Sequence, residues 1–517
     1  MKQGKFKASV IFLAMLVVVV MVSACSGNSG KTNDTNKSTD KPAATDAPKQ
    51  TDEGKTELPE YTISLVYPGT PQTDEALVEE AMNKILKEKI NAKIDLMPID
   101  WGAWDDKVNL LIASQDQDVD IMFTAQWTGF AKNVAKKAFL ELNDLLDEHG
   151  QGVIETLGPE FIKGSQINGI NYGIPTNKEL AAAGGIVYRK DVADELGIDM
   201  SKVKTIEDLD AVYAVVKEKR PDLVPLYISS TDNTFNAHFF GNYDFLGDST
   251  IPGAIFKDGD ETKVFAIEDT DRFKQTTKAT RDLFLKGYIN ADAATSQVSA
   301  QDAWKAGIVF SSVESLKPGK AEEVASGAGL SGKLEQIQMT EKTISASETT
   351  GSMLAISTTS QDPARAMMLI NLLHTDKELN NLINFGIEGT HYTRNGEIMT
   401  PTDKTTNYSP GAAWMFGNQF LNYLWETEDP DKWAKFKEFN STGKVSLGLG
   451  FVFNSEPVKN EVGALANVIK QYQVAIDRGA VDVDKVLPEY TKKLKEAGLD
   501  KVIAEKQKQF DEFLANK

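Results

Sequence analysis

The sequence predicts an α/β protein whose body is large enough for two to four domain-sized cores. From residue 61 onward, short segments with the alternating pattern of strands are followed by segments with helical periodicity. Hydrophobic residues make up 41% of the chain, which is enough to fill such cores. About 460 residues follow a polar N-terminal region, and one domain usually takes roughly 100–150 residues.

The first part of the body is expected to fold with helices on both faces of a mostly parallel sheet. Strands are expected at 61–67, 92–97 and 119–123, and helices at 77–90, 105–114 and 130–137. In sheets of this kind, ligands bind at the carboxyl ends of the strands. The loops 68–70, 100–104 and 125–128 are therefore the first places where we expect a ligand.

The same alternation continues along the rest of the chain. Further strands are expected at 170–175, 185–188 and 307–310, and further helices at 192–196, 206–219 and 273–286. Asp362 and Pro363 supply the N-cap and the first residue of an apolar helix over 364–373. The last hundred residues are expected to be mostly helical, with one helix beginning at Pro488 and another capped by Asp500.

Cys25, the only cysteine of the chain, stands at the end of an export signal. Three lysines precede a 13-residue apolar run over 10–22, which is too short for the roughly 20 residues that span a bilayer. The closing residues Val22-Ser-Ala-Cys25 resemble a bacterial lipoprotein lipobox. The resemblance implies that residues 1–24 are removed and that Cys25 is acylated. A signal peptide with a chance cysteine and an uncleaved anchor are the alternatives.

The segment after the cysteine has the composition of a tether. Residues 26–57 contain no Val, Ile, Leu, Met or aromatic residue, so they cannot offset the entropy cost of folding. A flexible chain of this length spans about 30 Å root-mean-square. We therefore expect a disordered tether over 25–57 that holds a folded body, beginning near Leu58, outside the cytoplasmic membrane.

Net charge excludes two classes of partner. The formal charge is −19, or about −22 once the three leader lysines are removed. Nucleic-acid binding needs a basic surface, so it is not expected, and docking on anionic lipid through the protein surface is not expected either. The body has no cysteine left for a disulfide and no second apolar run of membrane-spanning length.

Several short motifs follow one another in a characteristic order. They are Ile112-Ala-Ser114, Val119-Asp-Ile-Met-Phe123, Asn171-Tyr-Gly-Ile-Pro175, Gly185-Ile-Val-Tyr-Arg-Lys-Asp191 with Leu196-Gly197, and Ala306-Gly307. Together they resemble the extracellular solute-binding proteins (family 1) of carbohydrate ABC importers. Two C-terminal stretches, 385–392 and 487–490, are similar to a lipoprotein-type subgroup associated with aldouronates and other plant-polysaccharide fragments. The resemblance covers roughly residues 58–517.

The resemblance implies a periplasmic-binding-protein-like fold, with two discontinuous three-layer α/β lobes joined by hinge strands around a ligand cleft. We expect one lobe at 58–176 plus 308–345 and the other at 177–307 plus 346–517, with crossings near Pro175 and near 309–314. The implied partners are an oligosaccharide and a two-subunit membrane permease. We expect a monomer without cofactor or metal, and the anchorage favours a Gram-positive host.

A sugar site needs aromatic faces for the C–H surfaces of the rings and polar groups for the hydroxyls. Aromatic residues in loops after strands are the best candidates, and polar residues at the expected crossings complete the site. The predicted ligand-binding residues are Trp101, Trp104, Gln126, Trp127, Asn177, Glu179, Phe235, Glu314 and Trp414. Trp304, in a helical run, is a weaker candidate, and His391 and Arg394 would suit an acidic sugar.

An enzymatic function is the main alternative to sugar binding. The four histidines lie far apart without metal-ligand spacing, and the body has no cysteine nucleophile and no G-x-S-x-G motif. A glycosidase needs only two well-placed carboxylates, and 75 acidic residues leave that alternative open. A sugar-sensing or adhesion receptor built on the same fold is the other alternative. Binding without catalysis is the reading we expect.

Overall fold

The computed structural model describes residues 58–114 and 118–516 of the chain. The predicted leader, Cys25 and the predicted tether over 25–57 lie outside the described residues. Residues Leu58–Lys517 form one compact unit. In the part of the chain that the structure describes, no helix combines the length and the apolar character needed to cross a membrane.

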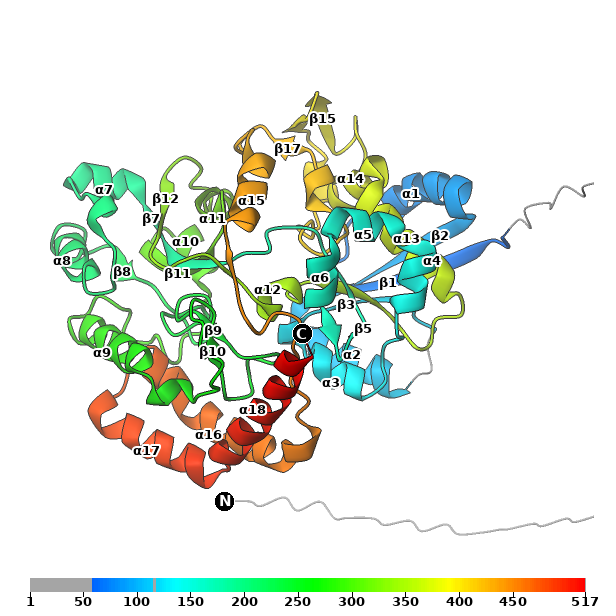
Figure 1. The fold of residues 1–517 in the computed structure, drawn as a ribbon. Helices are drawn as coiled ribbons and strands as arrows, with labels where there is room; N and C mark the ends of the chain where they lie inside the picture. Colours follow the sequence, from blue (N-terminus) through cyan, green and yellow to red (C-terminus); the bar gives the residue numbers. More distant parts are fainter. Residues whose placement is uncertain (1–57, 115–117, 517) are drawn as a thin grey trace, which may run out of the picture. The chain divides into compact units, whose positions relative to one another are not determined.

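The first sheet has five strands in the order β2-β1-β3-β14-β6 (Figure 1). β1 is parallel to β2 and β3, whereas β14 runs antiparallel to β3 and β6. The strands are β1 (Tyr61–Pro68), β2 (Ala92–Ile99), β3 (Ile121–Thr124), β6 (Ile174–Pro175) and β14 (Met353–Ile356). The parallel part confirms the arrangement expected from the alternating pattern.

Helices cover this sheet and share one hydrophobic core with it. On α1, for example, Val78, Met82 and Leu86 follow the helical period and are fully buried. The N-cap predicted for α13 is present, because the Asp362 side chain accepts a hydrogen bond from the Arg365 N–H. The helices are α1 (Glu75–Ile90), α2 (Trp104–Ser114), α3 (Phe130–Ala135), α4 (Asn143–His149), α5 (Gln151–Leu157), α6 (Pro159–Gly164), α13 (Pro363–Thr375) and α14 (Lys377–Phe385).

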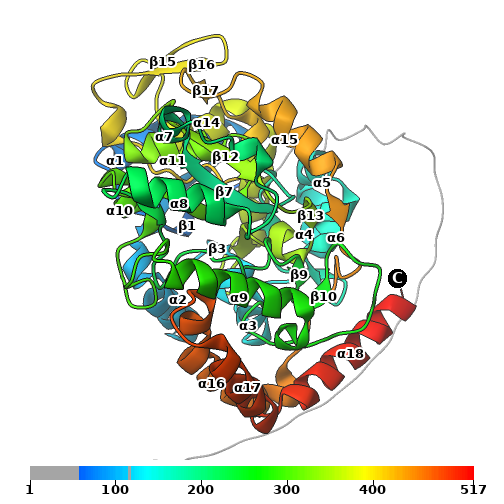
Figure 2. The same cartoon turned by 90° about the vertical axis from the view of Figure 1, so that its left-hand side faces the viewer.

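The second sheet has four strands in the order β12-β7-β11-β8. Its strands are β7 (Ala183–Arg189), β8 (Val224–Leu226), β11 (Val309–Leu316) and β12 (Leu334–Gln338). Its helices are α7 (Lys190–Leu196), α8 (Leu209–Lys219), α9 (Asp271–Leu285), α10 (Ala300–Lys305) and α11 (Lys320–Ala328). Figure 2 faces this side of the unit, with α8 and α9 towards the viewer.

Three C-terminal helices form a further core with the hairpin-like pair β9 (Tyr243–Asp244) and β10 (Ile255–Phe256). The helices are α16 (Lys459–Asp477), α17 (Val483–Glu496) and α18 (Leu499–Ala515). They confirm the helical C-terminal region, but α17 begins before Pro488, which lies inside it, and α18 has Gly498 and not Asp500 as its N-cap. In Figure 2, α16 and α17 lie below α9.

Smaller elements complete the unit. Antiparallel β4 and β5 form a hairpin, β13 is parallel to β18, and β15, β16 and β17 form a three-stranded sheet. Their bounds are β4 (Gln166–Ile167), β5 (Ile170–Asn171), β13 (Thr343–Ile344), β15 (Tyr392–Asn395), β16 (Ile398–Pro401), β17 (Leu424–Trp425), β18 (Lys444–Val445), α12 (Ala346–Thr349) and α15 (Lys432–Ser441).

The pairing of the strands corrects part of the predicted division into lobes. The chain passes from the first sheet to the second after Pro175, as expected. However, β11 pairs with β7 and β8, so 308–345 does not belong with the first sheet. The return occurs over 339–352, because β14 pairs with β3. The assignment depends on which distant strands pair with each other, and no local sequence pattern reveals that pairing.

Glu268→Gln is expected to stabilise the fold more at pH 8 than at pH 5. Burial raises the pKa of the Glu268 carboxyl, next to α9, from 4.5 to about 7. The folded state therefore binds the proton more tightly than the unfolded state, and stability falls as pH rises from about 4.5 to about 7. Above pH 7 the cost approaches about 3 kcal/mol.

Thermal unfolding of wild type and E268Q at the two pH values measures this difference. The exposed Glu496→Gln, in the neighbouring α17, is the matched control and should change stability little at either pH. A gain for E268Q of equal size at pH 5 and pH 8 would contradict the assignment.

Candidate ligand-binding site

Three tryptophans lie together at the carboxyl ends of β2 and β3. Trp101 follows β2, Trp127 follows β3, and Trp414 comes from a distant loop. The distance between ring centroids is 6.0 Å for Trp101 and Trp127, 6.2 Å for Trp101 and Trp414, and 6.3 Å for Trp127 and Trp414. Trp101 and Trp127 are each 50% exposed. This tryptophan patch offers aromatic surface on which a sugar ring can stack.

The patch is attached to the segment that returns from the second sheet to the first. Gly129, at φ +82°, ends the short turn that carries Trp127. The indole N–H of Trp127 donates to the Gly351 carbonyl at 2.9 Å, and the Ser352 hydroxyl donates to the Trp414 carbonyl at 2.8 Å. The Gln126 N–H donates to the Thr350 carbonyl at 2.9 Å. Residues 350–352 therefore hold the loops of Trp127 and Trp414.

A cavity of about 250 Å³ adjoins the patch, because Gly351 belongs to its lining. Its walls come from both crossing segments and from the end of β11. The lining residues are Lys178, Glu179, Ala181, Ala182, His238, Ser315, Leu316, Lys317, Lys320, Ser347, Glu348 and Gly351. Glu179, a predicted site residue, thus lines a cavity that extends to Gly351, the hydrogen-bond partner of Trp127.

Charged side chains at this cavity neutralise one another in a lysine–glutamate cluster, which comprises Lys178, Glu179, Glu314, Lys317, Lys320 and Glu323. The N–O distances are 3.0 Å for Lys178–Glu179, 3.4 Å for Lys317–Glu179 and 3.0 Å for Lys317–Glu323. Lys320 lies 2.9 Å from Glu323 and 3.7 Å from Glu314. Each of the three lysines therefore has a carboxylate partner.

Glu179 is ionised and has a free oxygen. Burial opposes its charge, but the ammonium groups of Lys178 and Lys317 outweigh burial and lower the pKa of Glu179 to about 2. Its Oε1 accepts both lysine contacts, whereas its buried Oε2 has no hydrogen-bond partner. An ionised, preoriented oxygen of this kind suits a sugar hydroxyl as its donor.

A second cavity, of about 260 Å³, shares Lys320 with the first and is lined by residues 312–314 of β11. Glu314 lines it and accepts a hydrogen bond from the Ser312 hydroxyl at 2.9 Å. Burial raises the pKa of Glu314. Trp304 also belongs to the lining, but its ring is 1% exposed and its indole N–H donates to the Ser312 hydroxyl at 3.2 Å.

A buried ion pair supports the floor of the first cavity. The fully buried Lys257 ammonium lies 2.6 Å from Glu348 Oε1 and 3.0 Å from His238 Nδ1. The main chain and hydroxyl of Ser345 donate to Glu348 Oε2. Burial, together with the neighbouring ammonium, lowers the pKa of His238 to about 4, so its imidazole is neutral at physiological pH. Nδ1 accepts from Lys257, which leaves the proton on Nε2.

Other predicted site residues lie elsewhere. Trp104 is 4% exposed and packs edge-on against Phe123, and Phe235 is 1% exposed and packs edge-on against Phe240. Both rings are buried in hydrophobic cores, so the structure does not bring them to the exposed surface of the tryptophan patch. Asn177 donates to the Thr156 carbonyl at 3.1 Å and lines a different cavity.

Two residues considered for an acidic sugar are engaged in contacts away from the tryptophan patch. His391 is fully buried, and its Nε2 faces an Asp74 oxygen at 3.2 Å. Arg394 Nε donates to Glu388 at 2.8 Å within the β15 hairpin. Both contacts belong to the region around α14 and β15, so these residues do not join the tryptophan patch.

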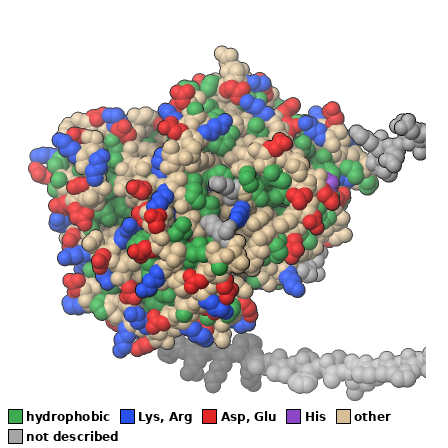
Figure 3. All heavy atoms as spheres, in the orientation of Figure 1, with side chains coloured by type: hydrophobic (Ala, Val, Ile, Leu, Met, Phe, Trp, Pro, Cys, Tyr) green, Lys and Arg blue, Asp and Glu red, His purple; other side chains and the backbone are tan. Residues whose placement is uncertain are grey.

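A larger cavity, of about 830 Å³, lies between α9 and α17. Its lining combines four lysines, four acidic residues and a few aliphatic side chains, without an aromatic ring. It therefore lacks the stacking surface that a sugar site needs. Across the face in Figure 3, acidic and basic side chains are intermixed. Over the described ranges 58–114 and 118–516, no three His, Cys, Asp or Glu side chains are placed to hold a metal ion.

Comparison with known proteins identifies the family. The family model described as a bacterial extracellular solute-binding protein matches residues 68–378, which is more than half of the chain. This chain belongs to the bacterial extracellular solute-binding proteins. A second model, described as a domain of unknown function, matches residues 447–515 of this solute-binding protein. The predicted family resemblance is thereby confirmed.

Relatives of this solute-binding protein support the same identification. A carbohydrate ABC transporter substrate-binding protein of Streptococcus pneumoniae is 32% identical over 443 residues, which cover 84% of this chain and 87% of the relative. Lipoprotein LipO of Bacillus subtilis is 29% identical over 139 residues, 27% of each chain.

A solved structure agrees over nearly the whole body. The N-glycan transport solute binding protein (NgtS) from Streptococcus pneumoniae has a TM-score of 0.79 and 29% identity, covering 89% of this chain and all of that one. The same protein in complex with Man1GlcNAc gives a TM-score of 0.75. These matches confirm the predicted α/β solute-binding-protein fold.

Proposed function

We propose that this chain is the substrate-binding component of an ABC importer and that it captures an oligosaccharide between the tryptophan patch and the lysine–glutamate cluster. One observation carries the proposal: the exposed indoles of Trp101 and Trp127 lie nearly parallel, and Trp127 is bonded to Gly351, which lines a polar cavity together with the ionised Glu179. Stacking on the indoles fixes the sugar ring, and the carboxylate orients its hydroxyls.

The charge pattern favours an uncharged sugar. Each lysine of the lysine–glutamate cluster is already paired with a glutamate, so an acidic sugar would have to break an existing ion pair. The relative NgtS has been solved with Man1GlcNAc and with Man5GlcNAc, which carry no charge. We infer a neutral oligosaccharide as the ligand class.

Capture would work by closure of two lobes. The sheet pairing supports a first lobe built on β1, β2, β3, β6 and β14 and a second built on β7, β8, β11 and β12. A sugar that touches the patch on one side and Glu179 on the other stabilises the closed arrangement. The closed protein then delivers the sugar to a two-subunit permease, while acylated Cys25 holds it on the outer face of the membrane. A Kd of roughly micromolar, about −8 kcal/mol, fits such reversible capture.

A thermal-shift screen of the purified protein tests the proposal. The panel contains neutral oligosaccharides rich in mannose and N-acetylglucosamine, neutral plant oligosaccharides and uronic-acid oligosaccharides. A neutral hit at 100 times its Kd adds about 2.7 kcal/mol and raises the unfolding temperature by several degrees. Product analysis accompanies each hit. Failure of every neutral sugar to shift the transition, or cleavage of the hit, would overturn the proposal.

A further inference from the structure

The loop between β9 and β10, residues 245–253, is held by a single buried lysine. Lys506 on α18 is fully buried, and its ammonium donates to the carbonyls of Phe245 (3.0 Å), Ile251 (3.0 Å) and Gly253 (2.9 Å). An ammonium group has three donors, so all of them are used by this loop. We call residues 245–253 the cleft loop.

The cleft loop adopts a backbone that needs outside support. Leu246 has φ +58°, which is uncommon for a residue with a side chain, and Gly247 has φ +122°. The Leu246 carbonyl accepts from the Phe453 N–H at 2.9 Å, and its N–H donates to Asp244 at 2.8 Å. Two of the donors to this loop, the Phe453 N–H and the Lys506 ammonium, lie within the matched region of unknown function at 447–515.

The opposite side of the cleft loop contacts the tryptophan patch. The Gln126 side chain donates to the Gly247 carbonyl, and Gln126 directly precedes Trp127. The Gln126 main-chain N–H also donates to the Thr350 carbonyl, and the Trp127 indole donates to the Gly351 carbonyl. Lys506 is thus connected to Gln126, the residue before Trp127, by its hydrogen bond to Phe245, the backbone of residues 245–247 and the hydrogen bond from Gln126 to Gly247.

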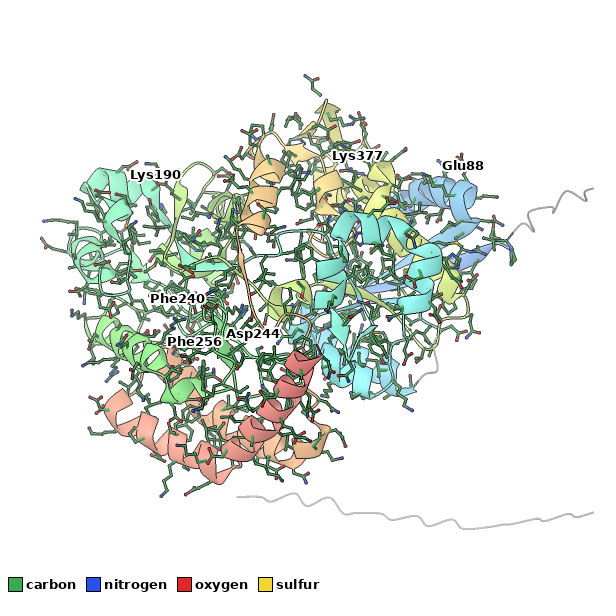
Figure 4. All side chains as sticks on the ribbon, in the orientation of Figure 1. Glu88, Lys190, Phe240, Asp244, Phe256 and Lys377 are labelled. Carbon is green, nitrogen blue, oxygen red and sulfur yellow. The ribbon has the colours of Figure 1, made fainter. Side chains whose placement is uncertain are left out.

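We propose that the C-terminal region 447–515 positions the cleft loop against Gln126, and that Lys506 is the positioning residue through which it acts. This inference rests on the proposed function for its effect on sugar binding. Figure 4 shows Asp244 and Phe256, which flank the cleft loop, in the region between α9 and α18. In this proposal, residues 447–515 help to shape the ligand-binding site without contacting the sugar.

Hydrogen exchange measured without sugar tests the structural half of the inference. Lys506→Met removes all three donors, and amide exchange is expected to rise at least tenfold both in the cleft loop and in residues 126–128. Leu494→Ala, a fully buried position on α17 of the same region, is the matched destabilised control and should leave residues 126–128 unchanged. Faster exchange confined to the cleft loop would overturn the coupling. If Lys506→Met does not fold, Lys506→Gln, which retains two donors, takes its place.

Calorimetric titration with the sugar found in the screen tests the binding half. Lys506→Met is expected to weaken the Kd about tenfold, whereas Leu494→Ala stays within twofold of wild type. The effect should shrink in a Gln126→Ala background, because Gln126 is the next residue in the chain of contacts. Equal loss in both backgrounds would overturn the inference. Absence of sugar binding by wild type itself counts against the proposed function, and the exchange data then decide this inference alone.

Discussion

Trp127→Ala is expected to weaken oligosaccharide binding by about 1–2 kcal/mol, roughly 5- to 30-fold, while the fold is retained. The ring is half exposed, and its aromatic contacts are with the other two tryptophans of the patch and with Phe123, so we expect little loss of core contact beyond the hydrogen bond to Gly351. Trp101→Ala combined with Trp127→Ala removes both exposed faces and is expected to weaken binding by about 3 kcal/mol, more than a hundredfold.

Isothermal titration with the screened sugar measures these losses, and circular dichroism confirms folding. Trp425→Ala is the matched control, because this partly buried tryptophan lies on β17 and packs against Phe385, away from the patch. Wild-type affinity in the double variant would remove the tryptophan patch from the ligand site.

Lys257→Met is expected to lower the free energy of unfolding by about 3–5 kcal/mol, because it leaves the buried Glu348 carboxylate without its cation. The ammonium is fully buried and lies 2.6 Å from that carboxylate. Adding Glu348→Gln removes the unpaired charge and is expected to restore much of the loss, since the amide oxygen still accepts from Ser345. Guanidinium unfolding of the single and double variants measures both steps.

A second observable reports on the same ion pair. In wild type, burial and the adjacent ammonium lower the pKa of His238 to about 4. Removal of Lys257 takes away that repulsion and leaves Glu348 as a neighbour, so the His238 pKa is expected to rise. NMR titration of the imidazole follows it. A single variant that loses less than 1 kcal/mol with an unmoved His238 pKa would show that the pair is not coupled to the fold as described.

Local patterns were sufficient for β1, β2 and β3 of the first sheet and for helices α1, α2, α3 and α13. The burial of Val78, Met82 and Leu86 on α1 follows directly from their spacing. Trp101 and Trp127 could be placed at strand ends from their position after apolar segments. Trp104 could not, because it begins α2, and the direction of its ring depends on how that helix packs on Phe123.

Long-range features were beyond the sequence. The pairing of β11 with β7 joins residues more than a hundred positions apart, so 308–345 was assigned to the wrong sheet. The lysine–glutamate cluster was only partly anticipated for the same reason. Glu179 and Glu314 stood at predicted crossings, but Lys317, a partner of Glu179, lies 138 positions away from it and has no distinguishing motif. Phe235 lies in a polar stretch of sequence, which favoured a loop position, but the folded chain buries its ring in a hydrophobic core.

The attachment of the tryptophan patch to residues 350–352 bears on how such a protein can diversify. Two of the three anchoring contacts use the main-chain carbonyls of Thr350 and Gly351, and these oxygens are present whatever side chain stands there. Side-chain substitutions at positions 350 and 351 therefore leave both acceptors in place. Exchange of Trp127, by contrast, removes the indole N–H that donates to Gly351, whereas Trp414 is held through its own main-chain carbonyl and can be replaced without loss of that contact. The two tryptophans thus differ in how far each can change while residues 350–352 still anchor its loop.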